Sequence, residues 1–200
     1  MRIVAGAGPG NPDYLSKEVR DAILQAKKVL AFGRIKESLE SIRKDIIPVK
    51  TIDEACKQLN TPDNVLLLVS GDPCFFGIVD YLKRKGLILD KILPGISAVQ
   101  YFAARLQIPW SGARVISFHG RSLELSKLDS ATCFFFTDSE NTPKKIAAAL
   151  ADAGYCGDLY IGYRLSYTDE TIIRTKIGEP IEANNSISIV GVVLDEHIER

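Results

Sequence analysis

Residues 65–73 read Val-Leu-Leu-Leu-Val-Ser-Gly-Asp-Pro: five large apolar residues that stop at four turn-forming ones. An uninterrupted apolar run of this length is typical of a central parallel strand, because such a strand is covered on both faces and neither face meets water. The coverage comes from helices packed above and below the sheet. The stretch therefore predicts an α/β protein with a parallel sheet.

The sequence that surrounds this run supplies the neighbours that a central strand needs. Apolar runs bounded by glycine, proline or serine predict further strands at residues 3–7, 29–32 and 87–93. The segments between them predict helices, since their apolar residues recur at helical spacing or, as with Thr51 and Glu54, they open on a capping box. Strands that alternate with helices predict a βαβ-type first domain.

Residues 107–112, Gln-Ile-Pro-Trp-Ser-Gly, interrupt this order, because proline and glycine break the chain and no periodicity continues through them. We therefore predict two α/β domains, residues 1–110 and 111–200, with the ligand cleft between them. The first is expected to have a parallel-rich sheet and the second a mixed one.

The second domain is predicted to be rich in strands, at residues 115–118, 133–137, 159–163, 171–176 and 188–194. A helix is expected between Thr142, with Pro143 at its first helical position, and Gly154. The last two strands are expected to pair with each other, antiparallel, across the turn region between them.

The bulk composition narrows the classes of partner. Lys plus Arg and Asp plus Glu number 25 each, so neither nucleic acid nor a membrane is expected as a partner. The four cysteines match no metal-binding spacing and there are only two histidines, so no metal site is expected. The N-terminus leads directly into a strand, and no apolar run approaches the roughly 20 residues that span a bilayer. We expect a cytoplasmic protein.

Three loops with unusual composition follow predicted strands: residues 8–10 (Gly-Pro-Gly), 70–73 (Ser-Gly-Asp-Pro) and 94–98 (Pro-Gly-Ile-Ser-Ala). Ligands of open parallel sheets bind at the carboxyl ends of the strands, where such loops gather. Glycine lets the backbone approach a ligand closely, and proline stiffens the loop. The three loops together predict a ligand site at this edge of the sheet.

A dinucleotide site is the first alternative to weigh. Its fingerprint is Gly-x-Gly-x-x-Gly opening directly into a helix. This chain has Gly6 and Gly8, but Asn11 stands at the third glycine position and Pro9 stiffens the turn. The dinucleotide interpretation is therefore disfavoured.

The three loops resemble the signature motifs of the tetrapyrrole methylases, the class III S-adenosylmethionine-dependent methyltransferases, over residues 6–16, 70–77 and 94–98. Residues 100–106 with 109–110, 117–121 and 137–143 resemble the branch that methylates cobalt-precorrin-7 at C5 in cobalamin biosynthesis. The resemblance implies C-methylation of this corrin precursor with S-adenosylmethionine as cofactor. It also implies a homodimer and a separate C15-methyltransferase/decarboxylase partner, for which a chain of this length has no room.

The resemblance implies roles for individual residues. Those expected to hold the cofactor are Pro9, Ser70, Gly71, Asp72, Phe75, Ser97, Ala98, Thr137 and Leu165. Those expected to bind the substrate are Arg121, Arg34 and Gly10, and His119 is the candidate base. Arginine suits a substrate rimmed with acetate and propionate groups, because its planar fork meets a carboxylate with two hydrogen bonds.

Plainer interpretations of some of these residues stay open. Asp72 and Ser97 could be helix N-caps, since both residue types are common there. Phe76 is expected in the core, Arg105 on a solvated helix face, and His119 could be a core histidine. For the whole chain, the alternatives are another class III methylase, acting on uroporphyrinogen, ribosomal RNA or a protein, and a non-catalytic nucleotide-binding α/β module.

Overall fold

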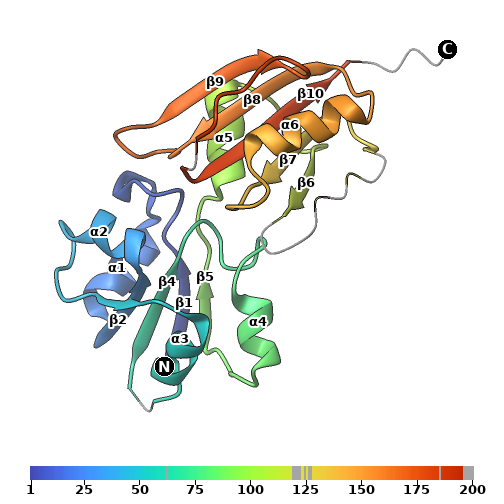
Figure 1. Ribbon diagram of the computed structural model, residues 1–200. Coiled ribbons are helices and arrows are strands. Elements are labelled where there is room, and N and C mark those ends of the chain that lie inside the picture. The colour runs from blue at the N-terminus through green and yellow to red at the C-terminus, as the bar shows by residue number, and fades with distance from the viewer. Residues whose placement is uncertain (62, 119–122, 124, 126–127, 185, 196–200) are drawn as a thin grey trace. The chain divides into compact units, whose positions relative to one another are not determined.

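The computed structural model describes residues 1–61, 63–118, 123, 125, 128–184 and 186–195, and Figure 1 shows its elements. The chain divides into two compact units, Met1–Ala98 and Val99–Arg200. One holds a parallel sheet and the other a mixed sheet, each with helices, so the predicted fold class is confirmed. The division falls ahead of the predicted linker at 107–112. The domain boundary after Trp110 and the cleft between the domains stay predictions.

The first unit contains a five-stranded parallel sheet in the order β3-β2-β4-β1-β5. The strands are β1 (Arg2–Gly6), β2 (Lys28–Phe32), β3 (Ile47–Val49), β4 (Val65–Val69) and β5 (Lys91–Leu93). The apolar run that opened the sequence argument is β4, which is central and buried at every residue. The strand predicted at 87–93 is shorter than expected, because only its last three residues form β5 and pair with β1.

Helices cover both faces of this sheet. They are η1 (Pro12–Tyr14), α1 (Lys17–Gln25), α2 (Gly33–Leu39), α3 (Ile52–Leu59) and α4 (Val79–Arg84). Leu66 and Leu68 of β4 share a core with α1 and α2, whereas Leu67 shares one with α3 and α4. Successive residues of β4 therefore point to opposite layers, which is why the strand had to be apolar throughout.

The residues predicted to open helices do so. Thr51 Oγ1 accepts a hydrogen bond from the Glu54 N–H at the start of α3, and the Glu54 carboxylate accepts one from the Lys50 N–H. Thr142 caps α6 (Pro143–Asp152) in the same way, with Pro143 in its first turn. Capping residues are reliable local signals, because their side chains accept hydrogen bonds from N–H groups that have no partner inside the helix.

The second unit contains a mixed five-stranded sheet in the order β6-β7-β10-β8-β9. The strands are β6 (Arg114–Ser117), β7 (Thr132–Phe136), β8 (Gly157–Tyr163), β9 (Thr171–Lys176) and β10 (Ser188–Leu194). The prediction that β9 pairs with β10 is wrong, because β8 lies between them and pairs antiparallel with both. Burial explains this order: β10 is largely buried and takes the centre, whereas β9 is largely exposed and takes an edge.

Two helices pack on this sheet. Phe102 of α5 (Ala98–Leu106) lies edge-to-face against Phe134 of β7, with the ring centroids 6.2 Å apart. The next residue of β7, Phe135, points to the other face, where it stacks on Phe118 and shares a core with Ile146 of α6. The two faces of β7 thus carry α5 and α6 respectively.

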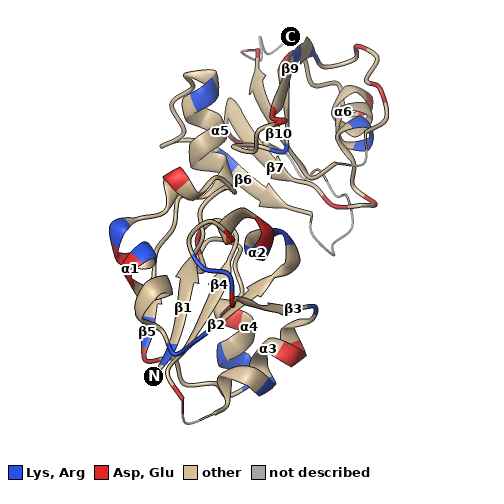
Figure 2. Ribbon diagram, turned by 90° about the vertical axis from the view of Figure 1, so that its left-hand side faces the viewer, with Lys and Arg blue, Asp and Glu red and all other residues tan. Residues whose placement is uncertain are grey.

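Charged residues of both signs are interspersed over both units, as Figure 2 shows, in keeping with the neutral balance of the sequence. In the described part of the chain, no helix has the length and apolar character needed to cross a membrane.

Candidate functional site

The loops that follow β1 and β4 are joined by their backbones. Gly8 and Gly71 form an antiparallel bridge, in which the Gly71 N–H donates to the Gly8 carbonyl over 2.8 Å. The strands are parallel neighbours, so both loops leave the same edge of the sheet. The predicted meeting of these two loops is confirmed.

Asp72 ties the second loop to the third. Its Oδ2 accepts a hydrogen bond from the Gly95 N–H (3.1 Å), and its Oδ1 accepts one from the Cys74 N–H (2.8 Å). The interpretation of Asp72 as a helix N-cap is wrong, because α4 begins only at Val79 and Ile78 is its N-cap residue. The carboxylate instead bridges the loop after β4, the central strand, and the loop after β5, the edge strand on the far side of β1.

The three loops approach so closely that side chains are excluded between them. A Cβ atom on Gly6 would lie 2.3 Å from the Gly71 carbonyl oxygen, and a Cβ atom on Gly95 would lie equally close to the same oxygen. Gly71 itself has φ +64°, which favours glycine. The glycines are therefore required for packing of backbone on backbone at this edge.

The predicted cofactor residues of the first unit gather at this contact. A Cβ atom on Gly71 would point at the third loop, 3.7 Å from the Cα atom of Ser97 and 4.0 Å from the nitrogen of Ala98. Ser70 is exposed, whereas Pro9 and Ser97 are buried. Gly71 thus faces the backbone of the third loop at Ser97 and Ala98.

The second loop continues, after Cys74, into two phenylalanines with different environments. Phe75 is half-buried, and its ring meets Phe76 edge-to-face with centroids 5.0 Å apart. The prediction that Phe76 belongs to the core is wrong, because it is 49% exposed and has φ +51°. The turn is tight here, since a Cβ atom on Gly77 would lie 2.1 Å from the Pro73 carbonyl oxygen.

Thr137 and Leu165 both lie in the second unit, at one edge of its sheet. Thr137 follows β7, and its Oγ1 donates to the Ser188 carbonyl over 2.7 Å. Leu165 follows β8 and is buried, with its side chain against Gly162. Since β7 and β8 both run antiparallel to β10, their carboxyl ends lie at the same edge.

Glu170 is a residue of this loop that the sequence analysis missed. Its Oε2 accepts a hydrogen bond from the Ser166 N–H (2.6 Å), and its Oε1 pairs with Arg105 Nε (3.0 Å). Arg105, expected on a solvated face, is 55% exposed but paired. Ser166 has φ +69°, so the carboxylate holds an unfavourable backbone conformation next to Leu165. No local pattern could have shown this, because Arg105 is distant in sequence.

Replacing Glu170 with glutamine should destabilise the protein by about 1–2 kcal/mol at pH 7, because it weakens two charge-assisted hydrogen bonds. Burial raises the pKa of Glu170, but hydrogen bonds from Tyr101, Ser166 and Arg105 lower it overall below its ordinary 4.5. A lowered folded-state pKa gives stability that is present above the unfolded value and is lost as the pH falls through the folded value. The difference between wild type and Glu170→Gln should therefore shrink below about pH 4.5.

Urea unfolding at several pH values checks this expectation. Glu182→Gln, at an exposed carboxylate of the same unit, is the matched control and should track the wild type. A difference between Glu170→Gln and wild type that stays constant down to pH 3 would contradict the role of the charge.

Of the predicted substrate residues, Arg34 is exposed in the first turn of α2, directly after the carboxyl end of β2, and Gly10 lies in the first loop with φ +149°. His119 and Arg121 lie outside the described residues.

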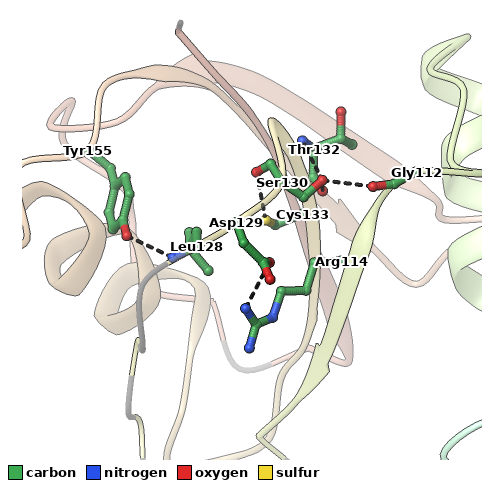
Figure 3. A network of polar contacts seen from close by, with 8 residues as sticks. All are labelled: Gly112, Arg114, Leu128, Asp129, Ser130, Thr132, Cys133 and Tyr155. Atoms are coloured by element: carbon green, nitrogen blue, oxygen red, sulfur yellow. Dashed lines mark hydrogen bonds and ion pairs between the residues drawn. The ribbon is translucent and has the colours of Figure 1, made fainter. Parts of the chain in front are cut away.

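The described residues that precede and follow His119 and Arg121 in the chain are held by hydrogen bonds and an ion pair, several of which Figure 3 shows. The Tyr155 hydroxyl accepts a hydrogen bond from the Leu128 N–H over 2.9 Å, and Arg114 pairs with Asp129. Ser130 Oγ lies 2.8 Å from the Gly112 carbonyl oxygen, so the segment that enters β7 is held beside the start of β6. On the other side, the Phe118 N–H donates to the Phe136 carbonyl.

The described residues form no metal-binding cluster, and their thiols differ in burial. Among those residues, no group of three or more His, Cys, Asp or Glu could hold a metal ion. The four cysteines are free, and burial raises the pKa of the Cys133 thiol to about 11. This edge of the sheet therefore presents backbone groups, hydroxyls, the bridging carboxylate of Asp72 and the exposed thiol of Cys74.

Comparison with known proteins agrees with this geometry. The family model of the tetrapyrrole (corrin/porphyrin) methylases matches residues 3–181. A probable cobalt-precorrin-7 C(5)-methyltransferase of Methanocaldococcus jannaschii is 30% identical, with all of both chains covered. Among solved structures, the precorrin-6Y methylase of Archaeoglobus fulgidus is similar with a TM-score of 0.76 at 20% identity, over 98% of each chain.

A uroporphyrin-III C-methyl transferase of Thermus thermophilus, solved in complex with S-adenosyl homocysteine, is similar with a TM-score of 0.74 at 20% identity, over 96% of this chain and 97% of that one. The chain belongs to the tetrapyrrole methylase family.

Proposed function

We propose that this protein is a methyltransferase that uses S-adenosylmethionine to methylate C5 of cobalt-precorrin-7 in cobalamin biosynthesis. The observation that carries the proposal is the meeting of three glycine-rich loops at the ends of β1, β4 and β5, in a chain of this family. The substrate position comes from the relative that matches over its full length, which is named for C(5) methylation.

The residues of the first unit fit the cofactor. S-adenosylmethionine supplies a methyl group on an already activated sulfonium, so the protein needs no metal or covalent nucleophile for this step. Ser70, Gly71 and Asp72 would hold its amino-acid and sulfur end, beside Ser97 and Ala98 of the third loop, which Gly71 faces. The cofactor set is completed in the proposal by Pro9, Phe75, Thr137 and Leu165.

The remaining task of the protein is positioning. The accepting carbon must be held about 3–3.5 Å from the methyl group, in line with the leaving sulfur, and water must be excluded. We assign carboxylate recognition on the substrate to Arg121 and Arg34, with Gly10 allowing close approach of the substrate. His119 would accept the proton released from the methylated carbon, because its unperturbed pKa suits a base near neutral pH.

The proposal extends to assembly and place in the cell. We propose a cytoplasmic homodimer, and methylation at C15 with decarboxylation by a separate protein, since the relative that matches over its full length is named for C(5) alone. The four free cysteines are consistent with a reducing compartment.

Two measurements on the wild-type protein test the function. Calorimetry with S-adenosylhomocysteine should give saturable binding, selective over NAD and ATP. Methyl transfer from labelled S-adenosylmethionine should occur to cobalt-precorrin-7 and not to uroporphyrinogen III or ribosomal RNA. Binding without transfer to any tetrapyrrole would contradict the substrate, and NAD or ATP binding without S-adenosylhomocysteine binding would favour the non-catalytic module.

A further inference from the structure

Phe76 is a large aromatic side chain in an unfavourable setting. It is 49% exposed, in a turn that lies between the buried residues Pro73 and Val79. Exposing an aromatic ring forgoes the stabilisation that its burial would bring. Burial in the core therefore does not account for phenylalanine at this position.

The backbone of Phe76 adds a second cost. Its φ of +51° lies in the left-handed region, which bulky residues rarely occupy and where glycine or asparagine is the ordinary choice. The turn has to bend here, since Gly77 packs against the backbone of Pro73 with no room for a side chain. Strained residues of this kind cluster at functional sites, because the rest of the structure holds them in place.

The position of Phe76 indicates what it contacts. It lies on the second loop, four residues beyond Asp72, the side chain that ties this loop to the third. The third loop also exposes an apolar side chain, Ile96, which is 39% exposed. Phe76 and Ile96 are thus both large apolar side chains exposed on segments that Asp72 ties together.

We propose that Phe76 is a substrate-binding residue, whose ring packs against the flat, apolar macrocycle of the tetrapyrrole. An aromatic ring suits this partner, because offset or edge-to-face contacts with a conjugated ring system add to the burial of apolar surface. The charged rim of the substrate requires cations, but its faces require a group such as Phe76. The inference rests on the proposed function and adds to it the residue that recognises the ring itself.

The decisive variant is Phe76→Gly, because glycine relieves the backbone strain while removing the ring. We expect a melting temperature no lower than that of the wild type, and a dissociation constant for S-adenosylhomocysteine within about twofold. The KM for cobalt-precorrin-7 should rise about tenfold or more, with kcat little changed. The reason is that the apolar contact with the ring is made equally in the ground state and in the transition state, so its loss weakens binding without slowing the chemical step. Phe76→Tyr, which keeps the ring, should stay close to wild type.

Two control variants separate this role from strain and from surface apolarity. Gln107→Gly relieves a similar backbone strain, φ +60°, in the second unit. Ile88→Ala removes a side chain that is 74% exposed and lies before β5, at the opposite end of that strand from the third loop. Both should leave the KM unchanged.

The outcomes divide cleanly. An unchanged KM in Phe76→Gly, with active wild type, overturns the inference and leaves the proposed function standing. A lower melting temperature or weaker S-adenosylhomocysteine binding overturns it in favour of a packing or cofactor role. A wild type that does not methylate cobalt-precorrin-7 overturns the proposed function, and the inference with it.

Discussion

Gly95→Ala should lower the free energy of unfolding by about 3 kcal/mol and abolish S-adenosylhomocysteine binding. The added Cβ atom would lie 2.3 Å from the Gly71 carbonyl oxygen and 2.8 Å from the backbone of Gly6. Backbone atoms cannot rotate away as a side chain can, so the third loop must move. That movement breaks the Gly95–Asp72 hydrogen bond and separates loops that the proposed cofactor site needs together.

Gly33→Ala is the matched control for this experiment. Gly33 opens α2, and a Cβ atom there would meet nothing within 4 Å. The substitution should therefore be neutral or slightly stabilising, because alanine favours helix. Denaturant unfolding and calorimetry on both variants check the expectation, and equal stability of Gly95→Ala and Gly33→Ala would refute the close packing of the loops.

Asp72→Asn should weaken S-adenosylhomocysteine binding at least about tenfold, or 1.4 kcal/mol. Asparagine keeps one acceptor oxygen, so it can still receive the Cys74 N–H. Its amide nitrogen cannot accept the Gly95 N–H, because both groups are donors. The third loop would then lose its hydrogen-bonded tie to the second, and the Gly95 N–H its partner.

The control for Asp72 isolates the local turn from the tie between loops. Asn184 Oδ1 accepts a hydrogen bond from the Ser186 N–H two residues on, as Asp72 Oδ1 does from Cys74. Asn184→Ala removes a turn of this kind and should leave calorimetric binding unchanged. Wild-type affinity in a folded Asp72→Asn protein would show that the tie between the loops does not support cofactor binding.

The sequence predicts most of the first unit because its signals are local. Each of these signals is contained in a short stretch of sequence: the apolar run of β4, the capping residue Thr51 and the three glycine-rich loops. Parallel strands then bring their carboxyl ends to one edge, so the meeting of the loops follows from the fold class.

The misjudged features depend on contacts between distant residues. The order β10-β8-β9 depends on which strand is buried, which local alternation does not decide. Glu170 is held by Arg105, and Phe76 has a left-handed backbone in a turn where Gly77 packs against Pro73. Neither feature can be recognised from the residue types of the local sequence alone.

Helix α5 has a consequence for how such a protein can be recombined with its relatives. The helix begins at Ala98, immediately after the third loop, yet Phe102 is built into the core of the second unit against Phe134. A chimaera joined in the Pro- and Gly-containing segment 107–112 would pair one parent's Phe102 with the other parent's sheet. A crossover placed before α5 would carry the helix along with the strands on which it packs, and would inherit an intact core.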